Sequence, residues 1–244
     1  MERSYSSYII IIIAIFVSMV VCRNYRHTRL ELALTNQTTI SQTDCATNET
    51  PIFVHTAGHI AGKYFQRRMT IRRTWKREAH KHGLRVIFVI GRPDPRLGQN
   101  ETNRIQRQLV KEADQYNDIL QFNFVENYYN LTLKAIAELR WAEIHCNRSR
   151  HLIKVDDDVL LNIPYLDAWL QKGNLPSGMI GRMLNTPANR TPGHKWYMPT
   201  RYYKRHFYRF LAGFGYILSM DRLKKILDTI GNFRGPILDI DDLF

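Results

Sequence analysis

Residues 151–162 read His-Leu-Ile-Lys-Val-Asp-Asp-Asp-Val-Leu-Leu-Asn, and this stretch decides the fold class and the chemistry. The apolar residues before the acidic triplet predict a buried strand that ends in Asp156, Asp157 and Asp158. Three neighbouring carboxylates repel one another, and a hard divalent cation relieves that repulsion through oxygen ligands. A solvated acidic turn is the alternative, although such a turn needs no apolar residues on both sides. In an extended segment Asp156 and Asp158 share one face, and Asp157 points to the other.

Outward from this strand, apolar runs and amphipathic segments alternate along the chain. Short apolar runs predict strands at 52–57, 85–90, 118–124 and 152–155. Helical spacing predicts helices at 66–81, 101–114 and 130–146. Strands that alternate with helices favour an α/β fold, a mostly parallel sheet with helices on both faces. In such sheets ligands bind at the carboxyl ends of the strands, where the aspartates stand.

The N-terminal segment predicts a membrane anchor. No charged residue occurs between Ser4 and Cys22, and a helix of that length spans about 28 Å, close to the thickness of bilayer hydrocarbon. The end of the segment is a poor cleavage site for a signal peptidase, which favours an uncleaved signal anchor. We therefore expect a short tail (1–7), a transmembrane helix (8–22), a polar stem (23–50) and one folded domain (51–244).

Two signals disagree about the orientation of this anchor. The arginines after the segment outnumber those before it, a distribution that would place the C-terminal body in the cytoplasm. Against it, six Asn-x-Ser/Thr sequons indicate a glycosylated, lumenal body: Asn36, Asn48, Asn100, Asn130, Asn147 and Asn189. Pro51 weakens the sequon at Asn48, so we expect glycans at the other five. The sequons favour a single-pass type II protein.

Net charge and cysteine content leave several kinds of partner and both cysteine states open. A formal net charge of +13 attracts polyanions, but a solvated basic surface gives the same number. No nucleic-acid recognition motif is present, so we expect no nucleic-acid partner. The three cysteines are too few for a disulfide scaffold. Cys45 and Cys146 could form one bridge in an oxidising compartment or stay as two thiols, and the sequence leaves both open.

Five segments, in order, resemble glycosyltransferase family 31, the β-1,3-galactosyltransferases and β-1,3-N-acetylglucosaminyltransferases. The first is Arg-Met-Thr-Ile-Arg-Arg-Thr-Trp at 68–75, and the second joins Asp-Ile-Leu at 118–120 to Tyr-Asn-Leu-Thr-Leu-Lys at 129–134. The others are Lys-Val-Asp-Asp-Asp-Val at 154–159, Ala-Gly-Phe-Gly-Tyr-Ile-Leu-Ser at 212–219 and Ile-Asp-Asp-Leu at 240–243. The resemblance covers roughly residues 51–244. Family members usually continue for several dozen residues beyond the last motif, so it implies a domain truncated at Phe244.

The resemblance implies a GT-A fold and an inverting hexosyltransferase of the Golgi membrane. Such an enzyme moves galactose or an N-acetylhexosamine from a UDP-sugar to a hydroxyl of a glycan acceptor, on glycoprotein or glycolipid, in β-1,3 linkage. Mn²⁺ or Mg²⁺ is the expected cofactor. A catalytically inactive, sugar-binding or chaperone-like relative is the alternative. A purified lumenal part that hydrolyses no UDP-sugar would favour it.

The resemblance also implies roles for single residues. Asp158 and Asp156 are the expected metal ligands, and Asp242 is the expected catalytic base, which takes the proton from the acceptor hydroxyl. The donor-binding residues are expected to be Arg68, Arg72, Arg73, Lys134, Asp156, Asp157 and Trp196. Guanidinium groups suit phosphate oxygens, but a solvated basic helix remains an equal reading for each arginine. Trp75 is expected in the core.

Overall fold

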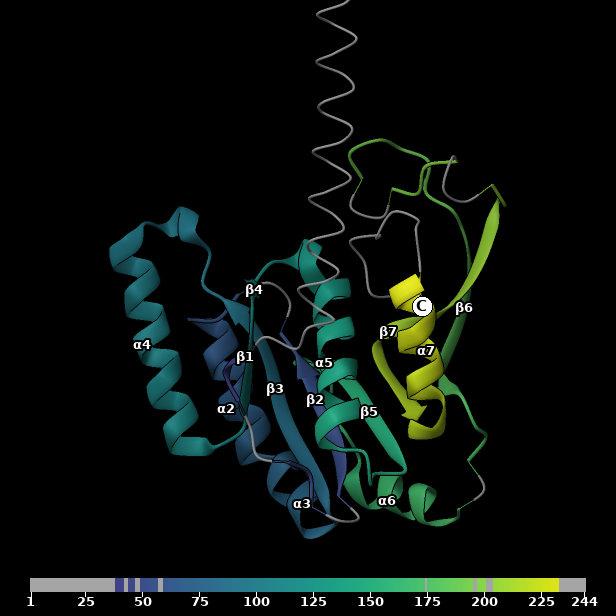
Figure 1. Cartoon of the computed structure of the whole chain (residues 1–244), viewed down its shortest axis with the longest axis horizontal. Coiled ribbons are helices and arrows are strands. Elements are labelled where there is room, and N and C mark those ends of the chain that lie inside the picture. Colours follow the sequence, from purple (N-terminus) through teal and green to yellow (C-terminus); the bar gives the residue numbers. More distant parts are fainter. Residues whose placement is uncertain are drawn as a thin grey trace, which may run out of the picture.

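The protein folds around one seven-stranded mixed sheet with helices on both faces (Figure 1). The computed structural model describes residues 38–41, 44–46, 49–56, 59–173, 175–194, 197–200 and 204–232. The strand order is β1-β4-β3-β2-β5-β7-β6. The bounds are β1 Thr38–Ile40, β2 Thr50–His55, β3 Leu84–Arg92, β4 Ile119–Val125, β5 His151–Asp156, β6 Met179–Pro187 and β7 Phe207–Ser219.

The middle of the sheet is parallel and its two sides are antiparallel. Strands β4, β3, β2 and β5 run in one direction, whereas β1 pairs antiparallel with β4 and β7 pairs antiparallel with β5 and β6. The central strands are buried nearly throughout, as expected for strands covered on both faces. The expected α/β class is confirmed, with a mixed sheet that is consistent with GT-A.

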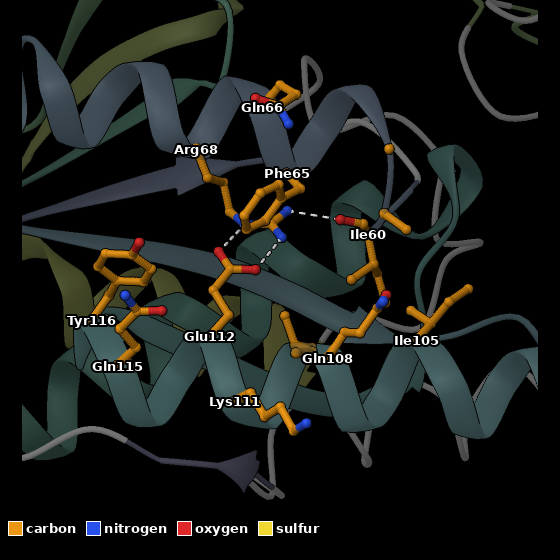
Figure 2. Close-up of a pocket in the computed structure, with 13 residues that line it drawn as sticks. Ile60, Phe65, Gln66, Arg68, Ile105, Gln108, Lys111, Glu112, Gln115 and Tyr116 are labelled. Carbon is orange, nitrogen blue, oxygen red and sulfur yellow. Dashed lines mark hydrogen bonds and ion pairs between the residues drawn. The ribbon is translucent and has the colours of Figure 1, made fainter.

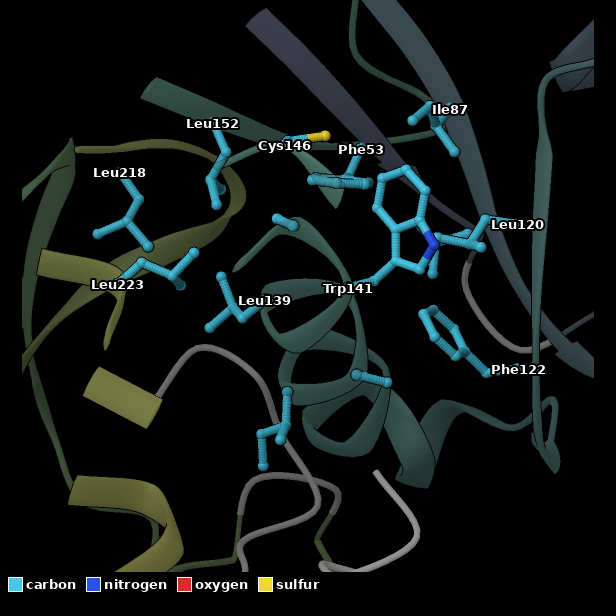
Figure 3. Close-up of a cluster of buried hydrophobic side chains, with 14 of the residues drawn as sticks. Phe53, Ile87, Leu120, Phe122, Leu139, Trp141, Cys146, Leu152, Leu218 and Leu223 are labelled. Atoms are coloured by element: carbon cyan, nitrogen blue, oxygen red, sulfur yellow. The ribbon is translucent and has the colours of Figure 1, made fainter. Parts of the chain in front are cut away.

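Two helical layers cover the sheet. Helices α2 (Lys63–Arg73), α3 (Trp75–Lys81), α4 (Gln99–Tyr116) and α6 (Ile163–Gln171) pack on one face, in a cluster that contains Trp75, as expected. Helices α5 (Leu131–His145) and α7 (Met220–Asn232) pack on the other. Short 3₁₀ turns, η1 (Pro95–Leu97) and η2 (Tyr128–Asn130), precede α4 and α5. Trp141 of α5 fills the centre of the second layer against Phe53 (Figure 3).

The structure differs from the sequence-based expectations at two of the predicted segments, and a third lies outside the described residues. The helix expected at 66–81 is two helices, separated at Thr74, whose hydroxyl bonds back to the Thr70 carbonyl at 2.7 Å. Thr38–Ile40 lies in the expected stem but forms edge strand β1 of the sheet. Among the described residues no helix is long and apolar enough to cross a membrane, and the expected anchor at 8–22 lies outside them.

A disulfide joins Cys45 to Cys146, so the bridged alternative is the one the structure adopts. The Cys45 amide also donates to the carbonyl of His145, at the last residue of α5, at 2.9 Å. The segment before β2 is thereby attached to the end of α5, across a sequence separation of 101 residues.

Candidate functional site

The acidic triplet stands at the carboxyl end of β5, between β2 and β7. The Asp156 side chain is 37% exposed and the Asp158 side chain 62% exposed, whereas Asp157 is buried. The Asp157 amide donates to the carbonyl of His55, the last residue of β2, at 2.9 Å. Two carboxylates therefore face solvent at the edge where parallel sheets bind ligands.

The sheet separates the first two aspartates. Lys154 pairs in register with Tyr216, which belongs to the α5 layer, and Asp156 follows Lys154 by two positions on the same face. The Lys154 ammonium donates to Asp156 Oδ1 at 2.8 Å and is itself buried. Asp157 points to the α2 layer instead, where its partner is Arg67 of α2. Asp156 and Asp157 therefore point to opposite faces as predicted, whereas Asp158 lies in the turn after β5 and near the same arginine as Asp157, so the predicted shared face of Asp156 and Asp158 is not observed.

Besides Lys154, Arg67 reaches the triplet. Its Nη1 donates to Asp157 Oδ1 at 2.5 Å and lies 3.6 Å from Asp158 Oδ2. Burial raises the pKa of Asp157, and the hydrogen bond and charge of Arg67 oppose that rise. The other oxygen of Asp157, Oδ2, is buried without a hydrogen-bond partner among the described residues. The sequence reasoning missed Arg67, although it directly precedes Arg68 in the basic helix.

The residues at this edge fit a cation that takes few protein ligands. No group of three or more His, Cys, Asp or Glu side chains in the described part of the chain is arranged to hold a metal ion. Asp156 and Asp158 nevertheless offer exposed side chains at the end of β5, whereas the unpartnered oxygen of Asp157 is buried on the α2 side. Mg²⁺ and similar hard cations are commonly held by one or two carboxylates plus phosphate oxygens and water. The donor set matches that pattern.

Arg68 and Arg72 anchor α2 to the rest of the domain. Arg68 is 1% exposed and grips Glu112 of α4 through Nε and Nη2 at 2.8 and 2.6 Å (Figure 2). Arg72 grips Asp118 at 2.8 and 2.7 Å, contacts Glu112 at 2.8 Å and stacks on the Tyr116 ring. Both guanidinium groups bind buried carboxylates in the structure, and their expected contact with the donor stays a prediction.

Lys134 is also committed inside the fold. It is fully buried, and its ammonium donates to Glu126 at 2.7 Å and to the Thr56 carbonyl at 2.8 Å. Glu126 in turn accepts from the Gly91 amide at 2.6 Å. This network ties α5 to the carboxyl ends of β2 and β3, and the expected contact of Lys134 with the diphosphate stays a prediction.

The remaining expected donor and catalytic residues are not tested here. Arg73 is exposed on α2, and no structural role is evident for it. Trp196 and Asp242 lie outside the described residues, as do Asn36 and Asn48.

A second buried pair, absent from the sequence reasoning, lies behind the triplet. His55 Nε2 and Glu138 Oε2 form a short hydrogen bond between the end of β2 and α5, and both side chains are buried. Glu138 Oε1 and the Trp141 indole nitrogen lie nearby in α5 without partners in the described part of the chain. Since the His55 carbonyl accepts from Asp157, this pair supports the backbone that presents the aspartates.

Two cavities open at the α2 side of the domain. The larger, about 400 Å³, lies between α2 and α4 over the Arg68–Glu112 pair, with Phe65 and Leu109 in its lining (Figure 2). The smaller, about 190 Å³, lies past the ends of β3 and β4 and includes His59, Asp94 and Asn127. The smaller cavity is at the same edge of the sheet as the triplet, where a nucleotide can bind.

The sequons differ in their surroundings. Asn100 and Asn147 are exposed. The Asn130 Nδ2, which would carry a glycan, donates to the Val125 carbonyl at 2.7 Å, and Thr132 of the same sequon is buried. Asn189 is half-buried, and its side-chain oxygen accepts from the Thr191 amide at 2.9 Å. The contacts of Asn130 speak against a glycan at that position.

Comparison with known proteins places this site in a family. The chain is 32% identical over 203 residues to human lactosylceramide 1,3-N-acetyl-beta-D-glucosaminyltransferase, covering 79% of this chain and 51% of the relative. It is 32% identical over 184 residues to human beta-1,3-galactosyltransferase 2, covering 72% and 42%. A zebrafish (Danio rerio) lactosylceramide 1,3-N-acetyl-beta-D-glucosaminyltransferase A is 33% identical over 193 residues, covering 74% and 49%. The chain spans about half the length of these curated relatives.

A solved structure of a UDP-glucose phosphorylase from Trypanosoma brucei aligns with a TM-score of 0.40 at 11% identity, covering 83% of this chain and 57% of that one. That likeness is too weak to support an argument. The family model for galactosyltransferases, in contrast, covers residues 66–244, from α2 through the acidic triplet to the end of the chain. With the ordered motifs and the curated relatives, it shows that the chain belongs to the galactosyltransferase family, glycosyltransferase family 31.

Proposed function

We propose that the protein is an inverting β-1,3-hexosyltransferase that takes galactose or an N-acetylhexosamine from a UDP-sugar. The observation that carries the proposal is the pair of exposed carboxylates, Asp156 and Asp158, at the carboxyl end of a central strand. The relatives, a 1,3-N-acetyl-beta-D-glucosaminyltransferase and a beta-1,3-galactosyltransferase, support the β-1,3 linkage and these two kinds of sugar. A glycan on a glycoprotein or glycolipid is the proposed acceptor, and the Golgi membrane, reached by a type II anchor, the proposed location.

Asp158 and Asp156 are the proposed ligands of Mn²⁺ or Mg²⁺, with the diphosphate supplying further oxygens. When bound, such a cation neutralises the charge that develops on the departing diphosphate. Lys154 holds Asp156 in place through its buried ammonium, and Arg67 fixes Asp157 while keeping a partly exposed guanidinium at the same edge. The chain thus presents both anionic and cationic groups to a metal diphosphate.

Asp242 is the proposed catalytic base. Inversion requires one carboxylate to take the proton from the acceptor hydroxyl as that oxygen attacks the anomeric carbon. The diphosphate then leaves from the opposite face, and no covalent enzyme intermediate forms.

A donor screen on the purified chain tests the proposal. UDP-galactose, UDP-N-acetylglucosamine and UDP-N-acetylgalactosamine are offered with Mn²⁺, and donor binding and transfer are measured separately. We expect Asp158→Ala to weaken donor binding roughly 100-fold. We expect Asp242→Asn to bind the donor normally without transfer. Glu101→Gln, an exposed carboxylate on α4, is the matched control and should match the wild type.

The outcomes separate three possibilities. Transfer that depends on Mn²⁺, Asp158 and Asp242 supports the proposal. Donor binding by the wild type without any transfer supports an inactive, sugar-binding relative instead. Full transferase activity in both aspartate variants would show that the site is wrongly assigned.

A further inference from the structure

Phe214 is a large apolar side chain that stays exposed beside the acidic triplet. It lies in β7 between Gly213 and Gly215 and is 45% exposed, whereas Tyr216, two residues on, is buried. Single exposed apolar residues are common on protein surfaces, so exposure alone carries no meaning. Its place in the sheet is what matters.

The strand register brings Phe214 near Asp156. Strands β5 and β7 are antiparallel, and the ladder pairs Lys154 with Tyr216 and Val155 with Gly215. The paired positions end there, and Asp156 and Phe214 are the next residues on the two strands. Neighbouring positions on paired strands lie within about 8 Å of each other, within reach of an aromatic ring. Tyr216 and Leu218, on the paired part of β7, belong to the buried cluster on the α5 side.

One buried cation holds the two segments together. The Lys154 ammonium donates both to Asp156 Oδ1, at 2.8 Å, and to the carbonyl of Gly213, the residue before Phe214. Lys154 is 1% exposed, so these contacts form away from solvent. The backbone that carries Phe214 is therefore fixed relative to the carboxylate, as a binding surface requires.

We propose that Phe214 is a specificity-determining residue, whose ring forms the apolar wall against which the hexose of the nucleotide sugar packs. The inference rests on the proposed function, because it needs the diphosphate to be held at Asp156 and Asp158. The hexose is bonded directly to that diphosphate, so it lies within one sugar ring of Asp156. A hexose has an apolar C–H face bounded by hydroxyls, and an aromatic ring buries that face while leaving the hydroxyls for polar partners.

The test compares ligands with and without the sugar. Calorimetry on the full chain with Mn²⁺ measures the affinities of UDP, UDP-galactose and UDP-N-acetylglucosamine. We expect Phe214→Ala to weaken binding of the preferred UDP-sugar roughly tenfold and to leave UDP binding unchanged. Phe214→Tyr keeps the ring and should keep the affinity. Met183→Ala, an exposed apolar residue of the neighbouring strand β6, is the matched control and should change neither ligand.

The result separates this inference from the proposed function. If the wild type binds neither UDP nor any UDP-sugar, the proposed function is wrong and the inference falls with it. If the wild type binds both ligands and Phe214→Ala binds them equally well, only the inference is overturned. A parallel loss of UDP and UDP-sugar affinity in Phe214→Ala, or a loss of sugar affinity in Met183→Ala, would also contradict it.

Discussion

Arg67, Arg68, Arg72 and Arg73 lie within two turns of α2, yet their environments give them different tasks. Arg68 and Arg72 are buried against Glu112 and Asp118. A buried charge is tolerated only when it is paired and hydrogen-bonded, so these two guanidinium groups serve to neutralise buried carboxylates within the fold. Arg67 remains 34% exposed at the acidic triplet, and both of its carboxylate contacts among the described residues use Nη1. It is the arginine of this helix best placed to meet a diphosphate.

Replacing Arg67 should therefore weaken binding of the donor more than replacing an exposed arginine nearby. We expect Arg67→Met to raise the KM for the UDP-sugar at least tenfold, because a charge-assisted contact at the phosphate edge is lost. Arg77→Met, at an exposed position of the neighbouring helix α3, should leave the KM within about twofold of the wild type. Steady-state kinetics against donor concentration measure both. Equal effects of the two substitutions would contradict the assignment.

The sequons make a second prediction for single residues. In chains expressed through a eukaryotic secretory pathway, Asn100→Gln should remove one glycan, because Asn100 is exposed, whereas Ser149 of the Asn147 sequon is buried and bonds to the Glu49 carbonyl. Asn130→Gln should leave the electrophoretic mobility unchanged but lower the melting temperature, since the Asn130 amide bonds to Val125. Peptide mapping by mass spectrometry identifies the sites. A glycan on Asn130 would show that this turn opens before or during glycosylation.

Elements around the site are held by buried ionic contacts rather than by apolar packing alone. Helix α2 is attached to α4 and to the start of β4 by Arg68, Arg72, Glu112 and Asp118. Helix α5 is attached to the ends of β2 and β3 by Lys134 and by the His55–Glu138 pair. These contacts join two sequence motifs that lie far apart along the chain, because Arg72 of the first binds Asp118 of the second.

The α2 attachment can be measured as stability. Arg72→Met should lower the free energy of unfolding by ~3 kcal/mol, because the substitution leaves two buried carboxylates with fewer partners. Arg77→Met, an exposed position on α3, is the control and should change it by less than ~0.5 kcal/mol. Urea unfolding followed by circular dichroism gives both values. A near-neutral Arg72→Met would mean that the carboxylates relax to other partners.

At the scale of the whole molecule, the sequence predicted the architecture better than the site. Apolar runs predict the four central strands to within two residues at each end, because strands buried on both faces leave a clear signal. The edge strand β1 is not predicted, because its three residues, Thr-Thr-Ile, are too short and too polar to show such a pattern. The triplet was found because it directly follows a buried strand. Arg67 was passed over in favour of Arg68, because residues adjacent on a helix differ by about 100° and sequence does not show which one is buried.

The disulfide closes most of the described domain into one covalent loop. Replacing both Cys45 and Cys146 by serine should lower the free energy of unfolding by ~4 kcal/mol, since the bridge spans a separation of 101 residues and constrains the unfolded chain. Cys22→Ser is the control, because the third cysteine lies outside the bridge. Guanidinium titrations under non-reducing conditions measure the difference. A loss below ~1 kcal/mol would show that the unfolded chain is already compact there.

The same bridge determines how the domain would carry a mechanical load. A pull on the chain from before Thr38 first acts on β1, a three-residue strand held at the sheet edge by β4 alone. Once β1 has peeled away, the tension reaches Cys45 and passes through sulfur to Cys146, at the end of α5. Strand β2, in the middle of the sheet next to the aspartates, then carries none of this tension. Repeated force on the chain before Thr38 would therefore leave the strand ends at the acidic edge aligned.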